Sequence, residues 1–189
     1  PIDLFLEASS RARAGSPTGE LPVVLATSDS AGQPNARVVL LKGVDSGFVF
    51  YTNQLSTKAK ELDRNPKGAL VFFWPEQELQ VRVRGNILLV SPEEADAYFG
   101  TRPRESQIGA HASKQSSPIA SREELIASFN EAMKLFENSE IPRPPHWGGY
   151  RLVPQAIEFW YRGDHRLHDR FLFETSDRGS TWVMTRLSP

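Results

Sequence analysis

The feature of this chain that most constrains its fold is a series of short runs of β-branched and aromatic residues with tight connections between them. The clearest run is residues 79–90, LQVRVRGNILLV, in which Val81 and Val83 alternate with arginines. An alternation with a period of two predicts a strand with one face toward a core and the other toward solvent. Because the connections are tight, we expect the strands to pair antiparallel.

The order of predicted elements indicates an α+β fold. Strands come first as a meander, helices are inserted, and strands return, which favours an antiparallel barrel with peripheral helices. The length of 189 residues suits one domain, or at most two small ones. The predicted strands are residues 22–29, 35–43, 47–53, 68–74, 79–90, 151–163, 165–175 and 180–189. The predicted helices are residues 3–14, ending near Gly15, and 56–65, 91–99 and 121–137, with a rigid loop over 141–150.

Helix starts are marked by capping signals. Ser91, Pro92 and Glu94 form one capping-box pattern, and Ser121 with Glu124 forms a second. Ser56 is predicted to cap the short helix that stops before Pro66. In the helix after Ser121, one face carries an apolar stripe, which favours core packing over a cofactor motif: Leu125, Phe129, Met133 and Phe136.

Composition excludes several classes of protein. Hydrophobic residues make up 39% of the chain, so we expect a buried core, and the net charge of -1 gives no reason to expect nucleic-acid or membrane binding. The absence of cysteine excludes thiol catalysis and disulfides. No run is long enough to span a membrane, so we expect a cytoplasmic protein. The four histidines show no metal-ligand spacing, so no metal is predicted.

The stretch HRLHDR, residues 165–170, concentrates positive charge. If it is a strand, Arg166, His168 and Arg170 share one face, where they repel one another unless an anion or an aromatic ring lies among them. The alternative is a solvated edge strand with Asp169 as the local counter-ion. The stretch alone leaves both interpretations open.

Basic and polar residues near strand ends indicate two phosphate-sized anion sites. Arg37 and Lys42 flank an apolar strand, and Ser56, Thr57 and Lys58 lie at a helix start, where free N–H groups favour a phosphate. A stretch that we expect to be rich in turns holds Tyr98, Arg102, Arg104 and Ser106, and Gln115 and Ser116 follow further along. Taken singly, each residue also fits a solvated surface. The aromatic residues Tyr51, Trp147 and Trp160 suit either the border of a flat ring or the core.

Seven strings taken together resemble the pyridoxine/pyridoxamine 5'-phosphate oxidase family: RVVLLKG, FYTN, RPRESQIGA, SKQSS, PRPPHWGGYRL, IEFW and RLHDR. They occur in the family's order from about residue 20 to the final RLSP. The resemblance implies one FMN-binding split β-barrel domain over residues 1–189, working as a homodimer with FMN at the subunit interface. It implies oxidation of pyridoxine or pyridoxamine 5'-phosphate to pyridoxal 5'-phosphate, a step of vitamin B6 metabolism, with oxygen as acceptor and hydrogen peroxide as product.

The resemblance also implies site residues. The substrate side would be Lys42, Tyr98, Arg102 and Ser106 for the phosphate, with Arg166 and His168 at the pyridine ring as the catalytic pair. The FMN side would be Arg37, Val38, Val39, Leu40, Leu41, Lys42, Tyr51, Thr52, Ser56, Thr57, Lys58, Gln80, Gln115, Ser116, Trp160 and Arg170.

Two departures from the family pattern are present. Thr57 stands where the family usually has an arginine in its FMN phosphate site. The family also carries a further N-terminal segment, and because this chain opens at Pro1 we expect that segment to precede it. Two alternatives stay open: a phenazine-type FMN oxidase of the same superfamily, and a non-catalytic flavin-binding protein.

Overall fold

The computed structural model describes residues 1–177 and 179–189, which form two compact units. Unit 1 contains Pro1–Phe50, Glu61–Leu88 and Arg151–Pro189, and unit 2 contains Tyr51–Lys60 and Leu89–Tyr150. Three elements continue along the chain from one unit into the other: β4 (Phe48–Asn53), α2 (Thr57–Arg64) and β7 (Trp147–Tyr161). The prediction of a single FMN-binding domain is not tested by this division and stays a prediction.

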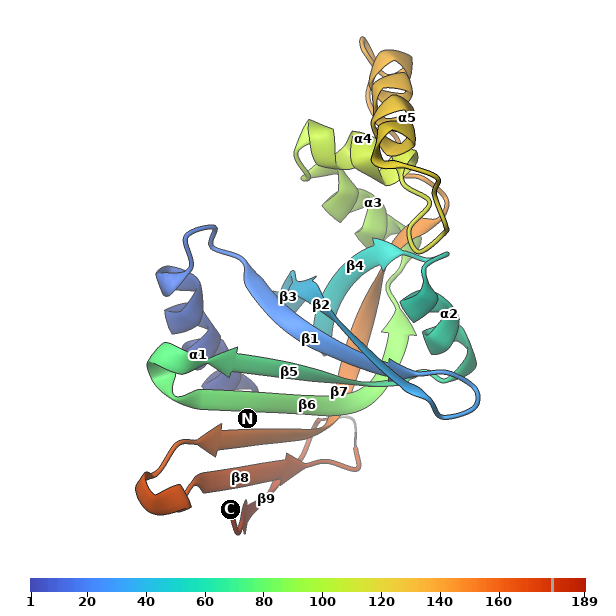
Figure 1. The fold of residues 1–189 in the computed structure, drawn as a ribbon. Helices are drawn as coiled ribbons and strands as arrows, with labels where there is room; N and C mark the ends of the chain where they lie inside the picture. The colour runs from blue at the N-terminus through green and yellow to red at the C-terminus, as the bar shows by residue number, and fades with distance from the viewer. Residues whose placement is uncertain (178) are drawn as a thin grey trace. The chain divides into compact units, whose positions relative to one another are not determined.

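The described strands form one nine-stranded sheet (Figure 1). Its order is β2-β1-β5-β6-β7-β4-β3, and β8 pairs with β7 while β9 pairs with β8. Every pair whose register is described is antiparallel, as the tight connections predicted. The remaining strands are β1 (Leu21–Ser28), β2 (Pro34–Leu41), β3 (Gly43–Val44), β5 (Lys67–Trp74), β6 (Leu79–Leu89), β8 (Asp169–Glu174) and β9 (Val183–Leu187).

Unit 1 has an aromatic core between its sheet and α1 (Ile2–Gly15). Phe5 of α1 is fully buried, and its ring meets those of Phe48 and Phe72 edge-on at centroid distances of 4.8 Å. On β6, Val81 and Val83 are buried while Arg82 and Arg84 are exposed, which confirms the predicted alternation. Burial of each large apolar side chain stabilises the fold by about 1.5–3 kcal/mol.

Unit 2 is largely helical. It holds α3 (Pro92–Gly100), α4 (Arg104–Ala112) and α5 (Arg122–Leu135). Two of the predicted caps are confirmed, since the hydroxyls of Ser91 and Ser121 each accept a hydrogen bond at 3.2 Å from the N–H three residues on. The predicted cap at Ser56 stays a prediction. The core cluster of the unit contains Phe99, Ile108, Ala132, Ile141 and Trp147, with Phe129 and Phe136 packed against it.

Three predictions about unit 2 are wrong. The stretch predicted to be rich in turns, residues 98–106, is helical at both ends, since α3 runs to Gly100 and α4 begins at Arg104, where the turn signals end at Pro103 and helix-forming residues follow. Met133 and Leu125 are 44% and 39% exposed, so only the phenylalanines of the predicted stripe pack inward. The loop predicted over 141–150 stops early, since β7 begins at Trp147.

The first residues of β7 include two glycines that leave no room for a Cβ. A Cβ on Gly148 would lie 2.7 Å from the Gln54 side chain, and one on Gly149 would lie 2.6 Å from the Tyr51 ring. These two glycines therefore allow side chains to approach the backbone closely within a strand. They lie in the strand itself, although they fall within the loop that was predicted over 141–150.

The strand predicted over residues 165–175 is wrong in its first half. Residues Asp164–Arg166 form a 3₁₀ turn, η2, in which His165 and Arg166 have φ angles of 53° and 65°. The chain folds back tightly here, because a Cβ on Gly163 would lie 2.1 Å from the carbonyl oxygen of Leu167. The strand β8 begins only at Asp169, so strand alternation does not place Arg166, His168 and Arg170 on one face. A second short 3₁₀ turn, η1, spans Pro75–Gln77.

Candidate functional site

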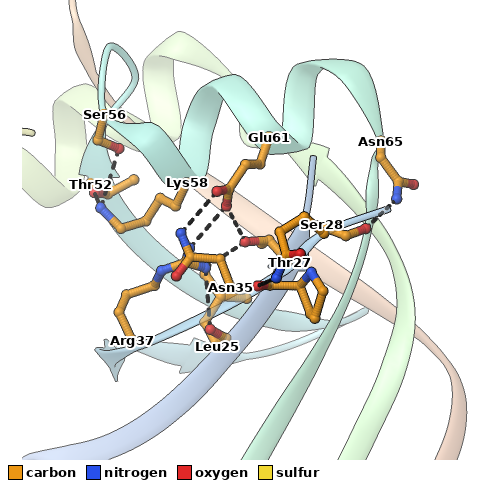
Figure 2. A network of polar contacts seen from close by, with 12 residues as sticks. Leu25, Thr27, Ser28, Asn35, Arg37, Thr52, Ser56, Lys58, Glu61 and Asn65 are labelled. Atoms are coloured by element: carbon orange, nitrogen blue, oxygen red, sulfur yellow. Dashed lines mark hydrogen bonds and ion pairs between the residues drawn. The ribbon is translucent and has the colours of Figure 1, made fainter. Parts of the chain in front are cut away.

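A buried lysine organises the first group of predicted site residues, in unit 2. The ammonium group of Lys58 donates hydrogen bonds to Thr52 Oγ1 at 3.0 Å, Ser56 Oγ at 3.2 Å and Gln115 Oε1 at 3.0 Å (Figure 2 shows the first two partners). Thr52 in turn donates to Gln115 at 3.0 Å. Ser56 and Lys58 are 0% and 9% exposed. The end of β4, the start of α2 and the loop after α4 thus bring four predicted residues together.

The surroundings of this group suit a phosphate. The first turn of α2 has N–H groups without intrahelical acceptors, and the helix dipole favours negative charge there. Ser116, beside Gln115, has a φ of 69°, a conformation that a non-glycine residue adopts rarely and that occurs often at binding sites. Thr57 is the exposed first residue of α2.

An aromatic stack with an arginine forms the second group, also in unit 2. The ring of Tyr51 stacks on Tyr98 at 4.1 Å and on Trp147 at 5.3 Å, with interplanar angles of 15° and 6°. The guanidinium of Arg102 lies over the Trp147 ring at 4.7 Å from its centroid, which is a cation–π contact. The structure therefore brings Tyr98 and Arg102 together on a flat aromatic platform.

The guanidinium of Arg102 has a hydrogen-bond donor without a partner in the described chain. Its Nη1 is buried and has no hydrogen-bond partner within the described chain. Burial lowers the pKa of the Arg102 guanidinium. Leaving a charged donor buried and unpaired is costly, so the arrangement suits an anionic ligand that completes its hydrogen bonds.

The third group lies in unit 1, on β7 and β8. Trp160 pairs with Arg170 across the two strands, and its ring lies 4.5 Å from that of His168. The Nδ1 atom of His168 accepts a hydrogen bond of 3.1 Å from Gly163 N–H, which fixes the ring beside the η2 turn. Arg170 Nε donates to Glu158 at 2.8 Å, and the pKa of Arg170 is raised mainly by this bond.

Arg37 is the centre of a fourth group, also in unit 1. It lies on β2, and its guanidinium contacts Thr27 and Glu61, which in turn bonds Asn35 (Figure 2). Glu61 and Thr27 are buried. In the sequence, Glu61 follows Lys58 by three residues within one predicted helix. Nothing in the sequence linked Glu61 to Arg37.

The other predicted site residues do not belong to any of these four groups. Lys42 donates to Glu20 at 3.2 Å, Gln80 lies on β6 opposite Phe73, and Ser106 and Arg166 are exposed. The remaining predicted FMN contacts, Val38, Val39, Leu40 and Leu41, follow one another along β2, with Val38 63% exposed and Leu41 buried.

The residue types in these groups are those that bind anions and aromatic rings. Buried Lys58, the donors around it and the indole of Trp160 are the types of residue that bind a phosphate and an aromatic ring system. In the part of the chain that the structure describes, no three histidine or acidic side chains gather as a metal site requires. Nor does any helix there have the length and apolar character needed to cross a membrane.

The fold and these groups define an antiparallel split-barrel protein with anion-binding features, and comparisons with known proteins agree. Residues 16–135 match the family described as pyridoxamine 5'-phosphate oxidase. Residues 147–189 match the region described as the pyridoxine 5'-phosphate oxidase C-terminal dimerisation region. The chain belongs to the pyridoxamine 5'-phosphate oxidase family, as its motifs predicted, and the predicted split barrel and oxidase class are confirmed with it.

Individual relatives are similar over most of their length. A pyridoxine/pyridoxamine 5'-phosphate oxidase of Paraburkholderia phytofirmans is 55% identical over 168 residues, which cover 88% of this chain and 78% of the relative. One of Anaeromyxobacter dehalogenans is 48% identical and covers 100% of this chain and 95% of the relative. Among solved structures, PhzG from Burkholderia lata in complex with tetrahydrophenazine-1-carboxylic acid has a TM-score of 0.88 at 31% identity, covering 100% and 90% of the two chains.

Proposed function

We propose that this protein oxidises pyridoxine 5'-phosphate or pyridoxamine 5'-phosphate to pyridoxal 5'-phosphate, with FMN as cofactor and oxygen as acceptor. The main support for the proposal is the buried Nη1 atom of Arg102, which has no hydrogen-bond partner in the described chain. This side chain lies beside the stacked rings of Tyr98 and Trp147. A phosphorylated aromatic substrate matches both features, since its phosphate can accept from the guanidinium while its ring lies near aromatic side chains.

FMN is the proposed cofactor, and two groups of residues would hold it. In unit 2, Lys58, Ser56, Thr52 and Gln115 would contact its phosphate, with Ser116 and Thr57 beside them. In unit 1, Trp160, Arg170 and Gln80 would contact the flavin ring, and Arg37 with the strand residues to Lys42 would also face the cofactor. When bound, FMN would accept two electrons from the substrate and pass them to oxygen, which yields hydrogen peroxide.

The chain's own residues would bind and orient the substrate. Arg102, Tyr98, Ser106 and Lys42 would hold its phosphate. Arg166 and His168 are the proposed catalytic pair. His168 is held by the Gly163 N–H at Nδ1, which leaves Nε2 to orient the polar group of the substrate or to move a proton. Arg166 is exposed at the η2 turn and would hold the pyridine ring and stabilise charge on it.

A homodimer is the proposed assembly, because the matched C-terminal region is described as a dimerisation region. Sedimentation of the FMN-loaded protein at micromolar concentration should give a dimer. A monomer that retains FMN would exclude a cofactor site at a subunit interface. A cytoplasmic location also stays part of the proposal.

A phenazine-type oxidase is the second candidate, favoured by the similarity to PhzG, whose structure holds a tetrahydrophenazine carboxylic acid. The two candidates differ in their need for a substrate phosphate. The test compares kcat/KM for pyridoxine 5'-phosphate, for unphosphorylated pyridoxine and for a reduced phenazine carboxylic acid. The B6 proposal expects turnover of the phosphate ester alone, with kcat/KM lowered and FMN retained in His168→Ala. Preference for the phenazine would support the second candidate instead.

A further inference from the structure

The guanidinium of Arg37 is held along one of its edges. Its Nη1 donates to the carbonyl oxygen of Leu25 at 3.2 Å and to Thr27 Oγ1 at 2.5 Å. Its Nη2 donates to Glu61 Oε2 at 2.9 Å. Figure 2 shows these partners on two elements, with Leu25 and Thr27 on β1 and Glu61 on α2. The edge formed by the two terminal nitrogens is therefore occupied by protein groups.

The carboxylate of Glu61 is itself held in place by hydrogen bonds. The hydroxyl of Thr27 donates to the same Oε2 that Arg37 contacts, and Asn35 Nδ2 donates to Oε1 at 2.9 Å. Arg37, Thr27 and Glu61 thus close a ring of hydrogen bonds. Burial of Glu61 acts to raise its pKa, but the bonds from Thr27, Asn35 and Arg37 outweigh burial and lower it, so the carboxylate stays charged at neutral pH.

The other edge of the guanidinium remains available. Arginine carries five N–H donors, and the contacts above use three of them. Toward the residues that the structure describes, Nε makes no hydrogen bond, and Nη2 keeps its second hydrogen. The side chain of Arg37 is 19% exposed, so it is not sealed within the core. Two parallel N–H groups of this kind match two oxygens of a phosphate.

We propose that Glu61 is a positioning residue that fixes Arg37 so that its Nε–Nη2 edge faces the phosphate of FMN. The proposal rests on the proposed function, since it takes FMN to be the ligand. Thr27 shares the role by closing the hydrogen-bond ring. A guanidinium that is already ordered loses less side-chain entropy when the phosphate binds, so fixing it increases affinity.

A competing explanation is that Glu61 only ties α2 to the sheet. The chain offers a matched control for it, because Asn65, the residue directly after α2, donates to Ser28 Oγ on β1 at 2.8 Å (Figure 2). That bond also joins the end of α2 to β1 but does not involve Arg37. A loss of affinity caused by loosening the helix should therefore appear in Asn65→Ala as well.

The test is titration of the full-length apo-protein with FMN and with riboflavin, which lacks the phosphate, followed by quenching of flavin fluorescence. Glu61→Gln keeps the shape of the side chain and removes its charge. We expect the Kd for FMN to rise about tenfold, equivalent to 1.4 kcal/mol, with riboflavin affinity and the Asn65→Ala control within about twofold of wild type. In an Arg37→Ala background, Glu61→Gln should change the FMN Kd by less than about twofold, because its effect acts through Arg37.

The other outcomes of the titration distinguish a failure of the proposed function from a failure of the role of Glu61. Failure of the wild-type protein to bind FMN would overturn the proposed function itself. If the wild-type protein binds FMN, three results would overturn the role of Glu61. They are an unchanged FMN Kd in Glu61→Gln, an equal loss of riboflavin affinity in that variant, and an undiminished effect of Glu61→Gln in the Arg37→Ala background. If Glu61→Gln does not fold, Thr27→Val opens the same ring. It should raise the FMN Kd about threefold, and an unchanged Kd there would overturn the proposal too.

Discussion

Glu158 on β7 accepts a hydrogen bond from Arg170 Nε on β8 at a distance of 2.8 Å. The two residues are diagonal neighbours, since Arg170 pairs directly with Trp160. The carboxylate is 5% exposed and also accepts a bond from Arg82 on β6. A buried charge within the apolar run IEFW is thus paired with a residue of the proposed flavin site.

The first prediction follows from this pairing. Removing one charge from a buried ion pair costs about 3–5 kcal/mol, whereas an exposed pair contributes about 1 kcal/mol or less. Because Arg82 is half exposed and Arg170 about a quarter exposed, we expect Glu158→Gln to lower the free energy of unfolding by about 2 kcal/mol. Urea unfolding measures this, with Glu174→Gln as control, since its pair with Arg84 is exposed on both sides. Equal losses in the two variants would contradict the role of burial.

The second prediction concerns pH. Burial acts to raise the pKa of both Glu61 and Glu158, but hydrogen bonds to each carboxylate outweigh it and lower the pKa below the usual 4.5. A carboxylate with a depressed folded-state pKa contributes stability that is present above the unfolded value and is lost as pH falls through the folded value. Acidification from about pH 6 to about pH 3 should therefore destabilise the wild type more than Glu61→Gln/Glu158→Gln. Parallel pH profiles from thermal unfolding would count against this.

The third prediction separates stability from function at Arg102. Arg102→Met removes a half-buried charge whose buried Nη1 lacks a partner in the described chain, so we expect unfolding stability to stay equal or to rise. The same change removes a charged hydrogen bond to the proposed substrate phosphate, which is worth about 1.5–3 kcal/mol. The kcat/KM for pyridoxine 5'-phosphate should fall roughly 10- to 150-fold. A less stable variant with normal kinetics would assign Arg102 to structure alone.

The fourth prediction uses the departure at position 57. Thr57 is the exposed first residue of α2, beside Lys58. An arginine there offers a charged fork where threonine offers one neutral hydroxyl. Thr57→Arg should lower the Kd for FMN by up to about tenfold, reduced by solvent exposure, with little change in the substrate KM. Fluorescence titration of apo-protein with FMN measures it. Weaker binding would mean that the new side chain faces away from the phosphate.

Strand periodicity predicted most of the sheet because burial on one face leaves a direct trace in the sequence, as Val81 and Val83 show. The same reasoning failed at residues 165–168, where the positive φ angles of His165 and Arg166 depend on the tight turn at Gly163. Likewise, Gly148 and Gly149 fell within a predicted loop, yet they lie in β7 and allow close contact with Gln54 and Tyr51. Such contacts join residues far apart in the chain and have no local signature.

For the same reason, some residues of the candidate site were predicted from the sequence and others were not. The motifs supplied Lys58, Arg102 and Arg170 through their resemblance to a family. They did not supply Glu61, which holds Arg37 in place, and they left Trp147, on which Arg102 lies, open between a ring border and the core. The contact between the Glu61 carboxylate and Arg37 forms only when the fold brings α2 next to β1 and β2, so it has no signature in the sequence.

The central claim is that this protein transfers electrons from a B6 phosphate to bound FMN. The most direct measurement adds pyridoxamine 5'-phosphate to the FMN-loaded protein without oxygen and follows the visible absorption of the flavin. We expect the yellow colour to bleach, to return when air is admitted, and to leave pyridoxal 5'-phosphate in solution. A flavin that stays oxidised with both pyridoxamine 5'-phosphate and pyridoxine 5'-phosphate would contradict the claim.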